Sequence, residues 1–434
     1  MTIAFMRLVD YYMGVPLCWC FAFLRTVQGW LRLRRSVSPT TRTILVIKCL
    51  GMGSVILTLP TLQALRDRYP RARIFFLSFT SNREVLELLN PADGVLTIDT
   101  TSVASFLATT FRVIRRLRKE SLDLVVDLEF FAKFPLLICF LAGAKHIAGF
   151  DLLLEWWRKA LLDFPGFFNY YHHVKDIFLS LAYLVATNDR YYRDFDDYRR
   201  RYGLPRITVP QRYDERLVER FDRLNVPAEA RQHIIVVNPN AGKELSPHLK
   251  RWPVELFADL SRQLLVRYPE SVLIYTGVSD ERAHVRSIID RVRSEYSPAR
   301  HRMFDAAGHL GLGELVALFA RSFVFITIDS GPMHLASLVH APSVCLFGAE
   351  SFRLYGPLNP RAVVVAKDLY CIPMFTVYDG KRNRLSQNIP MQLITVDEVL
   401  EAVATLRTHG EFVQNDVHHR TIGREMDAAM ARAV

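Results

Sequence analysis

The residues whose types and spacing most clearly suggest binding or catalysis lie in the segment FVFITIDSGPMHLA at 323–336. The run predicts a buried strand ending at Asp329, then a helix with Ser330 as N-cap, Gly331 allowing a close approach and Pro332 in the first turn. Free N–H groups at such a helix start attract an anion, ideally a diphosphate. His334 would lie on the first turn, close to that ligand. An ordinary capped helix with a surface histidine is the alternative.

A second strand, loop and helix pattern occupies ILVIKCLGMGSVILTLP at 44–60. Gly51 and Gly53 lie in the predicted loop, and Ser54 opens the predicted helix. The full dinucleotide fingerprint is absent, because Ile56 stands where the third glycine is required, and no phosphate-loop lysine follows. NAD binding and ATP hydrolysis therefore lose support. A helix-capping turn without a ligand explains the pattern equally well.

A third candidate is VVNPNAGKELSPHLKRWP at 236–253, where a strand ends in a polar loop that contains Asn240. Lys250 and Arg251 stand side by side at a helix entry, beside an aromatic residue. Two such cations suit a phosphate group. A solvated turn would show the same residues.

The fourth candidate, YTGVSDER at 275–282, is the weakest of the four. Gly277 ends a predicted strand, and Asp280 or Glu281 could reach a ribose hydroxyl. All four motifs follow predicted strands, and ligands of open α/β sheets collect at the carboxyl ends of strands.

The elements that must position these loops alternate between strand and helix, the pattern of parallel βαβ units. A chain of 434 residues favours two such domains. We expect two doubly wound, Rossmann-like α/β domains facing a cleft, at 41–215 and 216–410, with a linker at 199–215, an N-terminal segment at 1–40 and a tail at 411–434. Predicted strands are 43–49, 72–79, 95–99, 122–128, 233–239, 271–277, 323–329 and 342–348, and a long helical stretch is predicted over 150–200.

The net charge of +11 attracts anionic lipid, phosphorylated small molecules or nucleic acid. The basic residues are dispersed, and no zinc-finger or RNA-binding signature accompanies them, so nucleic acid is not expected as a partner. The six cysteines lie mostly in apolar runs and form no disulfide or metal pattern. The chain is expected to be cytoplasmic.

The apolar run at 13–24 is shorter than the roughly 20 residues that span a bilayer. Trp30 and the basic residues Arg32, Arg34 and Arg35 follow it. An apolar and aromatic helix beside a basic cluster predicts a segment lying on an anionic membrane surface, with the protein peripheral to the inner face of the cytoplasmic membrane. A helix packed into the core is the alternative.

Together these motifs resemble glycosyltransferase family 9, the heptosyltransferase family. The resemblance runs from about 44 to 403 and includes D-S-G-P-M-H-L-A at 329–336, K-R-W-P at 250–253, G-P at 356–357 and I-T-V-D-E-V-L-E-A-V at 394–403. It implies an inverting, metal-independent transferase of GT-B fold, working on a cell-envelope glycolipid or polysaccharide. The acceptor would bind to the N-terminal domain.

The same resemblance implies that the C-terminal domain holds a nucleotide-sugar, often ADP-heptose, as co-substrate and without another cofactor. Lys250 and the loop 329–334 would bracket the donor diphosphate and stabilise the leaving nucleotide. Asn240, Arg251, Gly277 and Glu281 complete the expected donor site. The pair Asp194 and Asp196 lies in a charged stretch and is interpreted as solvated, so no metal site is expected.

One departure from the family concerns the general base. The family commonly has L-G-D-V in its first loop, whereas this chain has M-G-S-V, with Ser54 in place of the aspartate. A neutral hydroxyl is a poor base. Glu129 and Asp127, at the end of LDLVVDLEFF, are the expected substitutes, on one face of the strand and with the pKa of Glu129 raised by burial. Asp151 or a substrate phosphate remain alternatives.

Other functional classes also stay open. A catalytically silent GT-B protein could bind a nucleotide-sugar or glycan as a sensor or as a subunit of a complex, and Ser54 favours this alternative. An epimerase or another nucleotide-sugar enzyme of the same fold is a further possibility.

Overall fold

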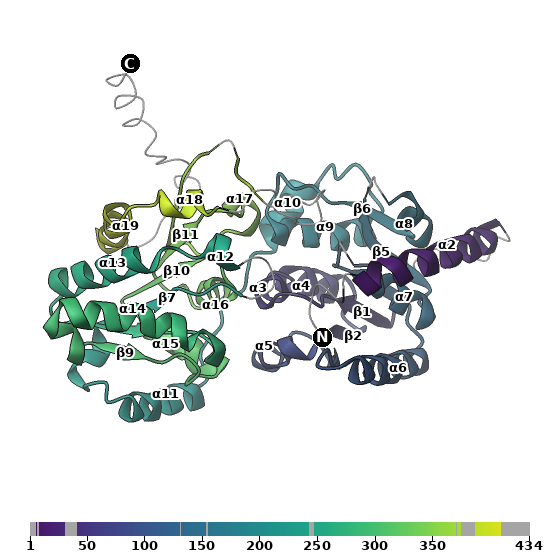
Figure 1. Cartoon of the computed structure of the whole chain (residues 1–434). Coiled ribbons are helices and arrows are strands. Elements are labelled where there is room, and N and C mark those ends of the chain that lie inside the picture. The colour runs from purple at the N-terminus through teal and green to yellow at the C-terminus, as the bar shows by residue number, and fades with distance from the viewer. Residues whose placement is uncertain are drawn as a thin grey trace, which may run out of the picture. The chain divides into compact units, whose positions relative to one another are not determined.

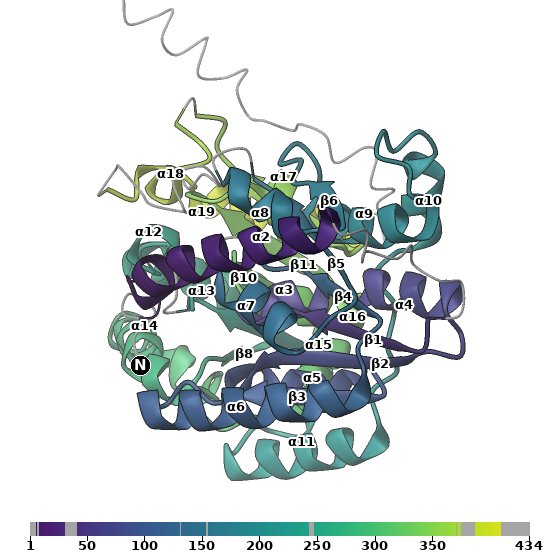
Figure 2. The same cartoon turned by 90° about the vertical axis from the view of Figure 1, so that its right-hand side faces the viewer.

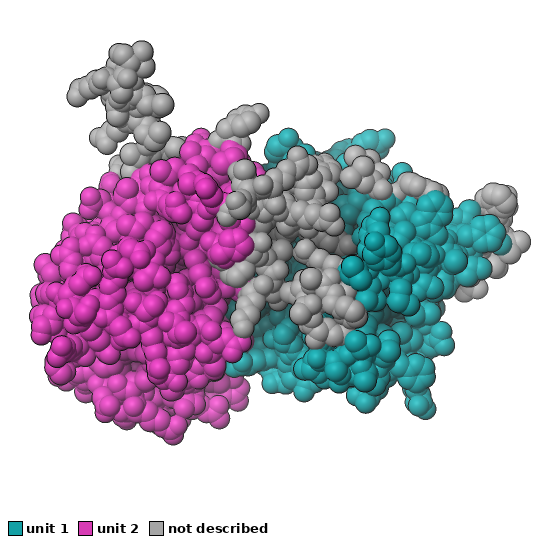
Figure 3. Space-filling view, in the orientation of Figure 1, with its two compact units in different colours: residues 1–205 teal, residues 206–434 magenta. Residues whose placement is uncertain are grey.

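The computed structural model describes residues 6, 8–30, 41–130, 132–152, 155–242, 247–369, 371–374 and 387–408. The chain forms two compact units, 1–205 and 206–434, which Figure 3 shows in teal and magenta. The division falls inside the predicted linker 199–215. The predicted basic cluster at Arg32, Arg34 and Arg35 and the predicted tail at 411–434 lie outside the described residues.

Unit 1 is built around a six-stranded parallel sheet in the order β3-β2-β1-β4-β5-β6 (Figure 1). Its strands are β1 Thr43–Ile47, β2 Arg73–Phe79, β3 Gly94–Ile98, β4 Leu124–Asp127, β5 His146–Asp151 and β6 Phe164–Phe167. Its helices are η1 Asp10–Gly14, α2 Val15–Trp30, α3 Met52–Ile56, α4 Leu59–Arg68, η2 Thr80–Asn82, α5 Arg83–Leu89, α6 Val103–Glu120, α7 Phe134–Leu141, α8 Trp156–Leu161, α9 Val174–Thr187 and α10 Phe195–Arg201.

Unit 2 repeats this architecture with the order β12-β11-β10-β7-β8-β9, again all parallel. Its strands are β7 Ile234–Asn238, β8 Val272–Tyr275, β9 Met303–Asp305, β10 Val324–Ile328, β11 Ser343–Phe347 and β12 Ala362–Ala366. Its helices are α11 Gln211–Arg223, η3 Glu229–Gln232, α12 Pro247–Lys250, α13 Val254–Arg267, η4 Ser279–Glu281, α14 Arg282–Glu295, η5 Ser297–His301, α15 Leu312–Arg321, α16 Gly331–Leu338, α17 Phe352–Tyr355, α18 Ile389–Gln392 and α19 Val396–Thr408.

Burial on both faces explains why the central strands form where the sequence predicts them. Every residue of β1, β4, β7, β10 and β11 is buried, as expected for parallel strands covered by helices on two sides. When the six strands of each unit are numbered 1 to 6 along the chain, both sheets have the order 3-2-1-4-5-6 of a Rossmann fold. The predicted fold class, two Rossmann-like doubly wound domains, is therefore confirmed.

Four strands were missing from the prediction: β5, β6, β9 and β12. The predicted helical stretch over 150–200 is wrong as one element, because β6 interrupts it and separates α8 from α9. The sequence of β6, FPGF, has too few residues for a period-two pattern, and its Pro and Gly are poor strand formers.

The N-terminal helix packs by one side onto unit 1. Cys18 and Ala22 are buried in the same cluster as β1 and α7, and the rings of Phe21 and Phe140 stack with centroids 4.1 Å apart. Within the described residues, none of the helices combines the length and apolar character needed to cross a bilayer. The core-packing alternative is therefore correct for this side of the helix, and the membrane prediction can concern only its outer side.

Both charged residues of the described N-terminal helix from Leu8 to Trp30 point inward. The Asp10 carboxylate accepts hydrogen bonds from the N–H groups of Lys133 and Phe134, at the start of α7. Arg25 forms a buried ion pair with Asp163. Burial raises the pKa of Asp10, and the N–H groups of α7 oppose that shift. Polar as well as apolar contacts therefore fix this helix to the sheet and helices of unit 1.

We predict that Arg25→Ala lowers the free energy of unfolding by about 3 kcal/mol, because Asp163 would be left buried without its cation. Urea unfolding of the full chain, followed by tryptophan fluorescence, would measure the change. The matched control is Arg112→Ala, an exposed arginine on α6, which should alter stability by less than about 0.5 kcal/mol. Equal effects of the two variants would contradict the packing described.

Candidate functional site

The Asp329 loop and Lys250 are brought together in unit 2. Asp329 directly follows β10, and its N–H donates to the carbonyl of Leu346 on the neighbouring strand. Lys250, the last residue of α12, places Nζ 2.5 Å from Asp329 Oδ2, and both side chains are largely buried. The structure therefore fixes the lysine at the carboxyl end of the sheet through a direct ion pair with the loop that the sequence singled out.

Ser330 occupies the N-cap position of α16, as predicted, but its side chain does not cap the helix. Its hydroxyl lies 3.1 Å from the hydroxyl of Thr327 instead. Gly331 and Pro332 begin the helix and are partly exposed, whereas His334 is buried on its first turn. Because no side chain caps the helix, its positive end is available to an anion.

The ends of β7 and β8 place Asn240, Thr276, Gly277 and Glu281 together. Asn240 Nδ2 donates to the Thr276 carbonyl at 3.1 Å, and Glu281 Oε2 accepts from the Val278 N–H at 2.9 Å. A Cβ at Gly277 would lie 2.6 Å from Asn240 Nδ2, so a side chain there would displace the asparagine.

Several buried polar atoms in this part of unit 2 lack a hydrogen-bond partner among the described residues. Asn240 Oδ1 and Thr276 Oγ1 are two of them, and Arg251 Nε, His284 Nε2 and Asn388 Oδ1 are three more. Buried polar groups are nearly always satisfied in folded proteins, so these atoms offer hydrogen bonds to water or to a polar ligand. Burial lowers the pKa of His284, and the charge of Arg251 lowers it further, which favours the neutral imidazole.

Thr276 and His284 were not identified from the sequence. Thr276 directly precedes the predicted Gly277, so its position at a strand end was the available signal. His284 lies inside α14, and nothing in its neighbouring residues distinguishes it from a surface histidine.

In unit 1 the predicted glycine loop is a turn into a short helix. Gly51 has φ of +81°, in the left-handed region that favours glycine, and is the N-cap of α3. Gly53 is buried inside that helix, and Ser54, half-buried, is its third residue, so the prediction that Ser54 opens the helix is wrong. The helix begins at Met52 because the turn is made by Gly51.

Glu129 is buried in a network that joins the ends of β1 and β4. Its Oε1 accepts from Lys48 Nζ at 2.7 Å and from the N–H groups of Cys49 and Leu50 at 2.8 and 2.9 Å. Its Oε2 accepts no hydrogen bond from any described residue. Glu129 is therefore not a solvated loop residue. The strand β4 ends at Asp127, so strand alternation, used to place both acids on one face, does not extend to Glu129.

Asp127 contacts the backbone of Glu129 and has no access to solvent. Its Oδ1 accepts from the Glu129 N–H at 3.0 Å, and its Oδ2 lies 3.6 Å from Arg158 Nη2. Burial raises the pKa of Asp127 to about 7, against the opposing effect of the Arg158 guanidinium. Arg158 is itself buried and donates to the carbonyls of Phe150 and Glu129. Asp127 thus supports the Glu129 backbone and cannot touch a substrate directly.

Asp151, the alternative base, and Asp196, interpreted as solvated, both stand apart from this network. Asp151 is half-buried and lies 3.9 Å from Lys159. Asp196 pairs with Arg199 at 2.7 Å on an exposed helix. Among the described residues, no group of three His, Cys, Asp or Glu side chains is arranged to hold a metal ion.

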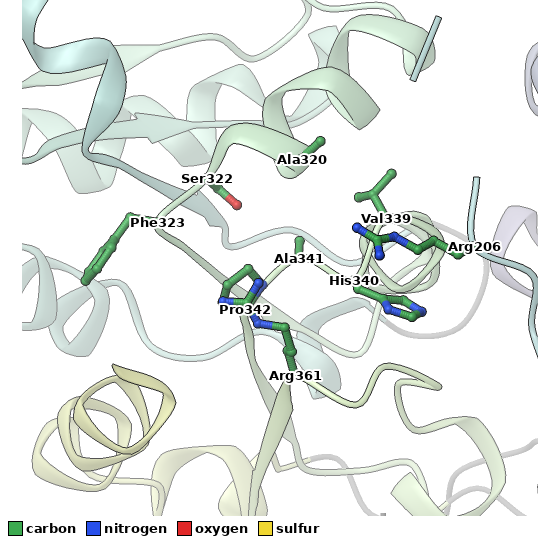
Figure 4. Close-up of a pocket in the computed structure, with 9 residues that line it drawn as sticks. All are labelled: Arg206, Ala320, Ser322, Phe323, Val339, His340, Ala341, Pro342 and Arg361. Carbon is green, nitrogen blue, oxygen red and sulfur yellow. The ribbon is translucent and has the colours of Figure 1, made fainter. Parts of the chain in front are cut away.

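A pocket of about 320 Å³ in unit 2 lies at the opposite edge of the sheet (Figure 4). Its lining residues precede β10, β11 and β12, and they include Arg206, His340 and Arg361, but none of the predicted site residues. Because ligands of parallel sheets bind at the carboxyl ends of strands, this pocket is not the predicted donor site.

Comparison with known proteins defines the class. The model of glycosyltransferase family 9 (heptosyltransferase) matches residues 110–382, and the chain belongs to this family. It is a glycosyltransferase, as the motifs predicted.

Named relatives agree with that assignment. The chain is 24% identical over 332 residues to lipooligosaccharide heptosyltransferase 2 of Haemophilus influenzae, covering 74% of this chain and 88% of the relative. The E. coli ADP-heptose lps heptosyltransferase II structure aligns with a TM-score of 0.65 and 20% identity, over 84% of this chain and 98% of that one. The E. coli heptosyltransferase WaaC with ADP aligns with a TM-score of 0.59 and 14% identity, over 84% and 99%. These structures support the GT-B fold.

We predict that Gly51→Ala lowers the free energy of unfolding by about 1–2 kcal/mol, because alanine is strained at the positive φ of this turn. Urea unfolding of the full chain measures it. Gly203→Ala is the matched control in the same unit, since a Cβ there meets no atom within 4 Å and φ is not positive. A Gly51→Ala variant as stable as the control would show that the turn relaxes without cost.

Proposed function

We propose that the protein is an inverting, metal-independent glycosyltransferase that moves a heptose-like or hexose sugar from a nucleotide-sugar to a cell-envelope glycolipid or polysaccharide. The ion pair of Lys250 and Asp329 at the uncapped start of α16 carries the proposal, because it puts a cation and a helix N-terminus at one strand end. Two comparisons support it: one relative is named lipooligosaccharide heptosyltransferase 2, and one structural neighbour is a heptosyltransferase with ADP bound.

The donor is proposed to bind to unit 2. Lys250 and the start of α16 would meet the diphosphate, and their positive charge would stabilise the leaving nucleotide as the bond to the anomeric carbon breaks. Asn240, Arg251 and Glu281 would contact the nucleoside, with Gly277 leaving room for it. The unsatisfied atoms Asn240 Oδ1 and Thr276 Oγ1 support this assignment, since a ribose or base offers the missing partners.

The proton of the acceptor hydroxyl is proposed to pass to Glu129. The hydroxyl oxygen forms the new bond to the anomeric carbon, the nucleotide leaves on the opposite side, and the configuration inverts. Three donors hold Glu129 Oε1, so Oε2 is the oxygen that would take the proton. Asp127 and Arg158 would act as positioning residues, because they contact the Glu129 backbone and not the solvent.

The protein is further proposed to be peripheral on the inner face of the cytoplasmic membrane, where a glycolipid acceptor is available. The outer side of α2 supports this location. Between Tyr11 and Trp30 the single charged residue is Arg25, which is buried, and Phe23 is 70% exposed. An uncharged, aromatic-rich helix surface suits the membrane interface.

A catalytically silent sugar-nucleotide-binding protein is the second candidate, favoured by the serine at position 54 in place of the family's aspartate. Release of free nucleotide from ADP-heptose, in the presence of a lipid extract as acceptor, distinguishes the two. A protein that binds the donor but never turns it over would belong to the second class.

For the donor site, Lys250→Ala is expected to weaken ADP binding by about 10- to 100-fold, because a charged hydrogen bond in a dry site is worth about 1.5–3 kcal/mol. Isothermal titration calorimetry with ADP measures the affinity. Lys250→Arg keeps the charge and should retain most of the binding, and Lys145→Ala, an exposed lysine of unit 1, should have no effect. Wild-type affinity in Lys250→Ala would remove this residue from the donor site.

For the base, Glu129→Gln is expected to lower kcat about 100-fold or more while leaving ADP affinity unchanged, since general bases contribute about 10²–10⁴-fold. Ser54→Ala should reduce turnover only slightly. Glutamine keeps an acceptor for Lys48, so the variant is expected to fold. Thermal unfolding of the variant checks this expectation. A folded, fully active Glu129→Gln enzyme would assign the proton transfer to another group.

A further inference from the structure

The amphipathic helix α6 (Val103–Glu120) exposes apolar side chains where a soluble helix normally carries polar ones. Its inner side is anchored by the buried residues Val113 and Leu117. On its outer side Val103, Leu107 and Phe111 follow one another at steps of four, and they are 48%, 61% and 69% exposed. Side chains four residues apart lie in one row along a helix, so they form a continuous apolar ridge.

The second half of the same helix presents a group of exposed cations. Arg112, Arg115, Arg116 and Lys119 are exposed, and none of them forms an ion pair or side-chain hydrogen bond with a described residue. Arg118 differs, since its Nε donates to the carbonyl of Leu141 at 2.7 Å. The apolar ridge therefore continues along the helix into an uncompensated positive patch.

This helix lies on the same face of the unit 1 sheet as the N-terminal helix. Between them lies α7, whose Phe134 contacts Phe106 of α6 at 4.8 Å between ring centroids, and whose Phe140 stacks on Phe21 of α2. Figures 1 and 2 show the three helices covering one side of the sheet. We call the outer surface of residues 8–27, α7 and α6 the helical face.

The helical face concentrates the exposed apolar surface of the protein. Thirteen of the twenty large hydrophobic side chains that are exposed among the described residues belong to it. Exposed apolar groups scattered singly need no explanation, whereas such a concentration marks a contact surface.

The charges of the face identify the chemistry of its partner. The acids within the three segments are Asp10, which caps α7, and Glu120, which pairs with Arg73 at 2.9 Å. A second copy of this face would bring more unpaired cations and no free acid to meet them. The partner that complements this face must be both apolar and anionic. A bilayer with anionic headgroups above its acyl chains has both properties.

We propose that the helical face docks on an anionic bilayer, with the apolar ridge of α6 at the boundary between headgroups and acyl chains and its cations against the lipid phosphates. The inference rests on the membrane location in the proposed function and extends it from the N-terminal helix to a second, independent element. Membrane contact would then involve helices separated in the chain by β1, β2 and β3, and would fix the orientation of unit 1 on the surface.

The test is co-sedimentation of the full-length protein with vesicles of phosphatidylcholine alone or with 30% phosphatidylglycerol. The double variant Leu107→Glu/Phe111→Glu should lose most binding to both. The variant Arg115→Gln/Arg116→Gln should bind anionic vesicles about 30-fold less, from two cations at about 1 kcal/mol each, and neutral vesicles unchanged. Val266→Glu, an exposed apolar residue of α13 in unit 2, is the matched control and should bind like the wild type.

Three results would separate the hypotheses. Wild-type protein that binds neither vesicle would overturn the membrane location itself, while leaving the donor site untested by this assay and still measurable by ADP titration. If the wild type binds vesicles and the α6 variants bind them equally well, α6 has no role in docking, and other residues must account for the membrane location. If sedimentation velocity without lipid shows that the wild type is a dimer and the α6 variants are monomers, a second copy of the protein covers the face and the bilayer proposal is wrong.

Discussion

An ion pair almost fully removed from water, between Lys48 and Glu129, organises the carboxyl edge of the first sheet. Isolated charges in such a place are costly, so the pair persists only because its geometry is nearly complete: the same carboxylate oxygen also binds two backbone N–H groups, and Lys48 Nζ also reaches the Leu50 carbonyl. The Lys250 and Asp329 pair has the corresponding position in the second unit. In unit 2 the acid directly follows β10, whereas Lys250 is the last residue of α12. In both units an ion pair of a lysine and an acid joins two loops at the carboxyl edge of the sheet.

The sequence predicted those loops well and their internal contacts poorly. The strands β1, β4, β7 and β10 are short apolar runs buried on both faces, so composition alone located them, and the parallel order brought Lys250 near Asp329. Lys48 and Arg158 were missed because their partners lie far away in the chain: Lys48 is 81 residues from Glu129. A lysine after an apolar strand, as in TILVIK, gives no local sign of whether it faces water or a buried acid.

The N-terminal segment shows a different limit of sequence reasoning. An apolar run with few charges has the same composition whether it packs on a core or faces a membrane, and here core packing accounts for one side of the helix. The periodicity was uninformative because nearly all side chains are apolar, and the inward direction of Asp10 and Arg25 depends on Lys133, Phe134 and Asp163, which come more than a hundred residues later.

The inward charges of this helix have a consequence for biosynthesis. While the chain is still being synthesised, Asp10 and Arg25 have no partners, and a helix with both charges free is a weaker ligand for any apolar surface. Asp163 emerges late, at the end of the first unit's sheet, and only then can Arg25 turn inward. The uncharged exterior of the helix is therefore a product of tertiary folding, so a nascent or misfolded chain lacks the surface that the finished protein presents.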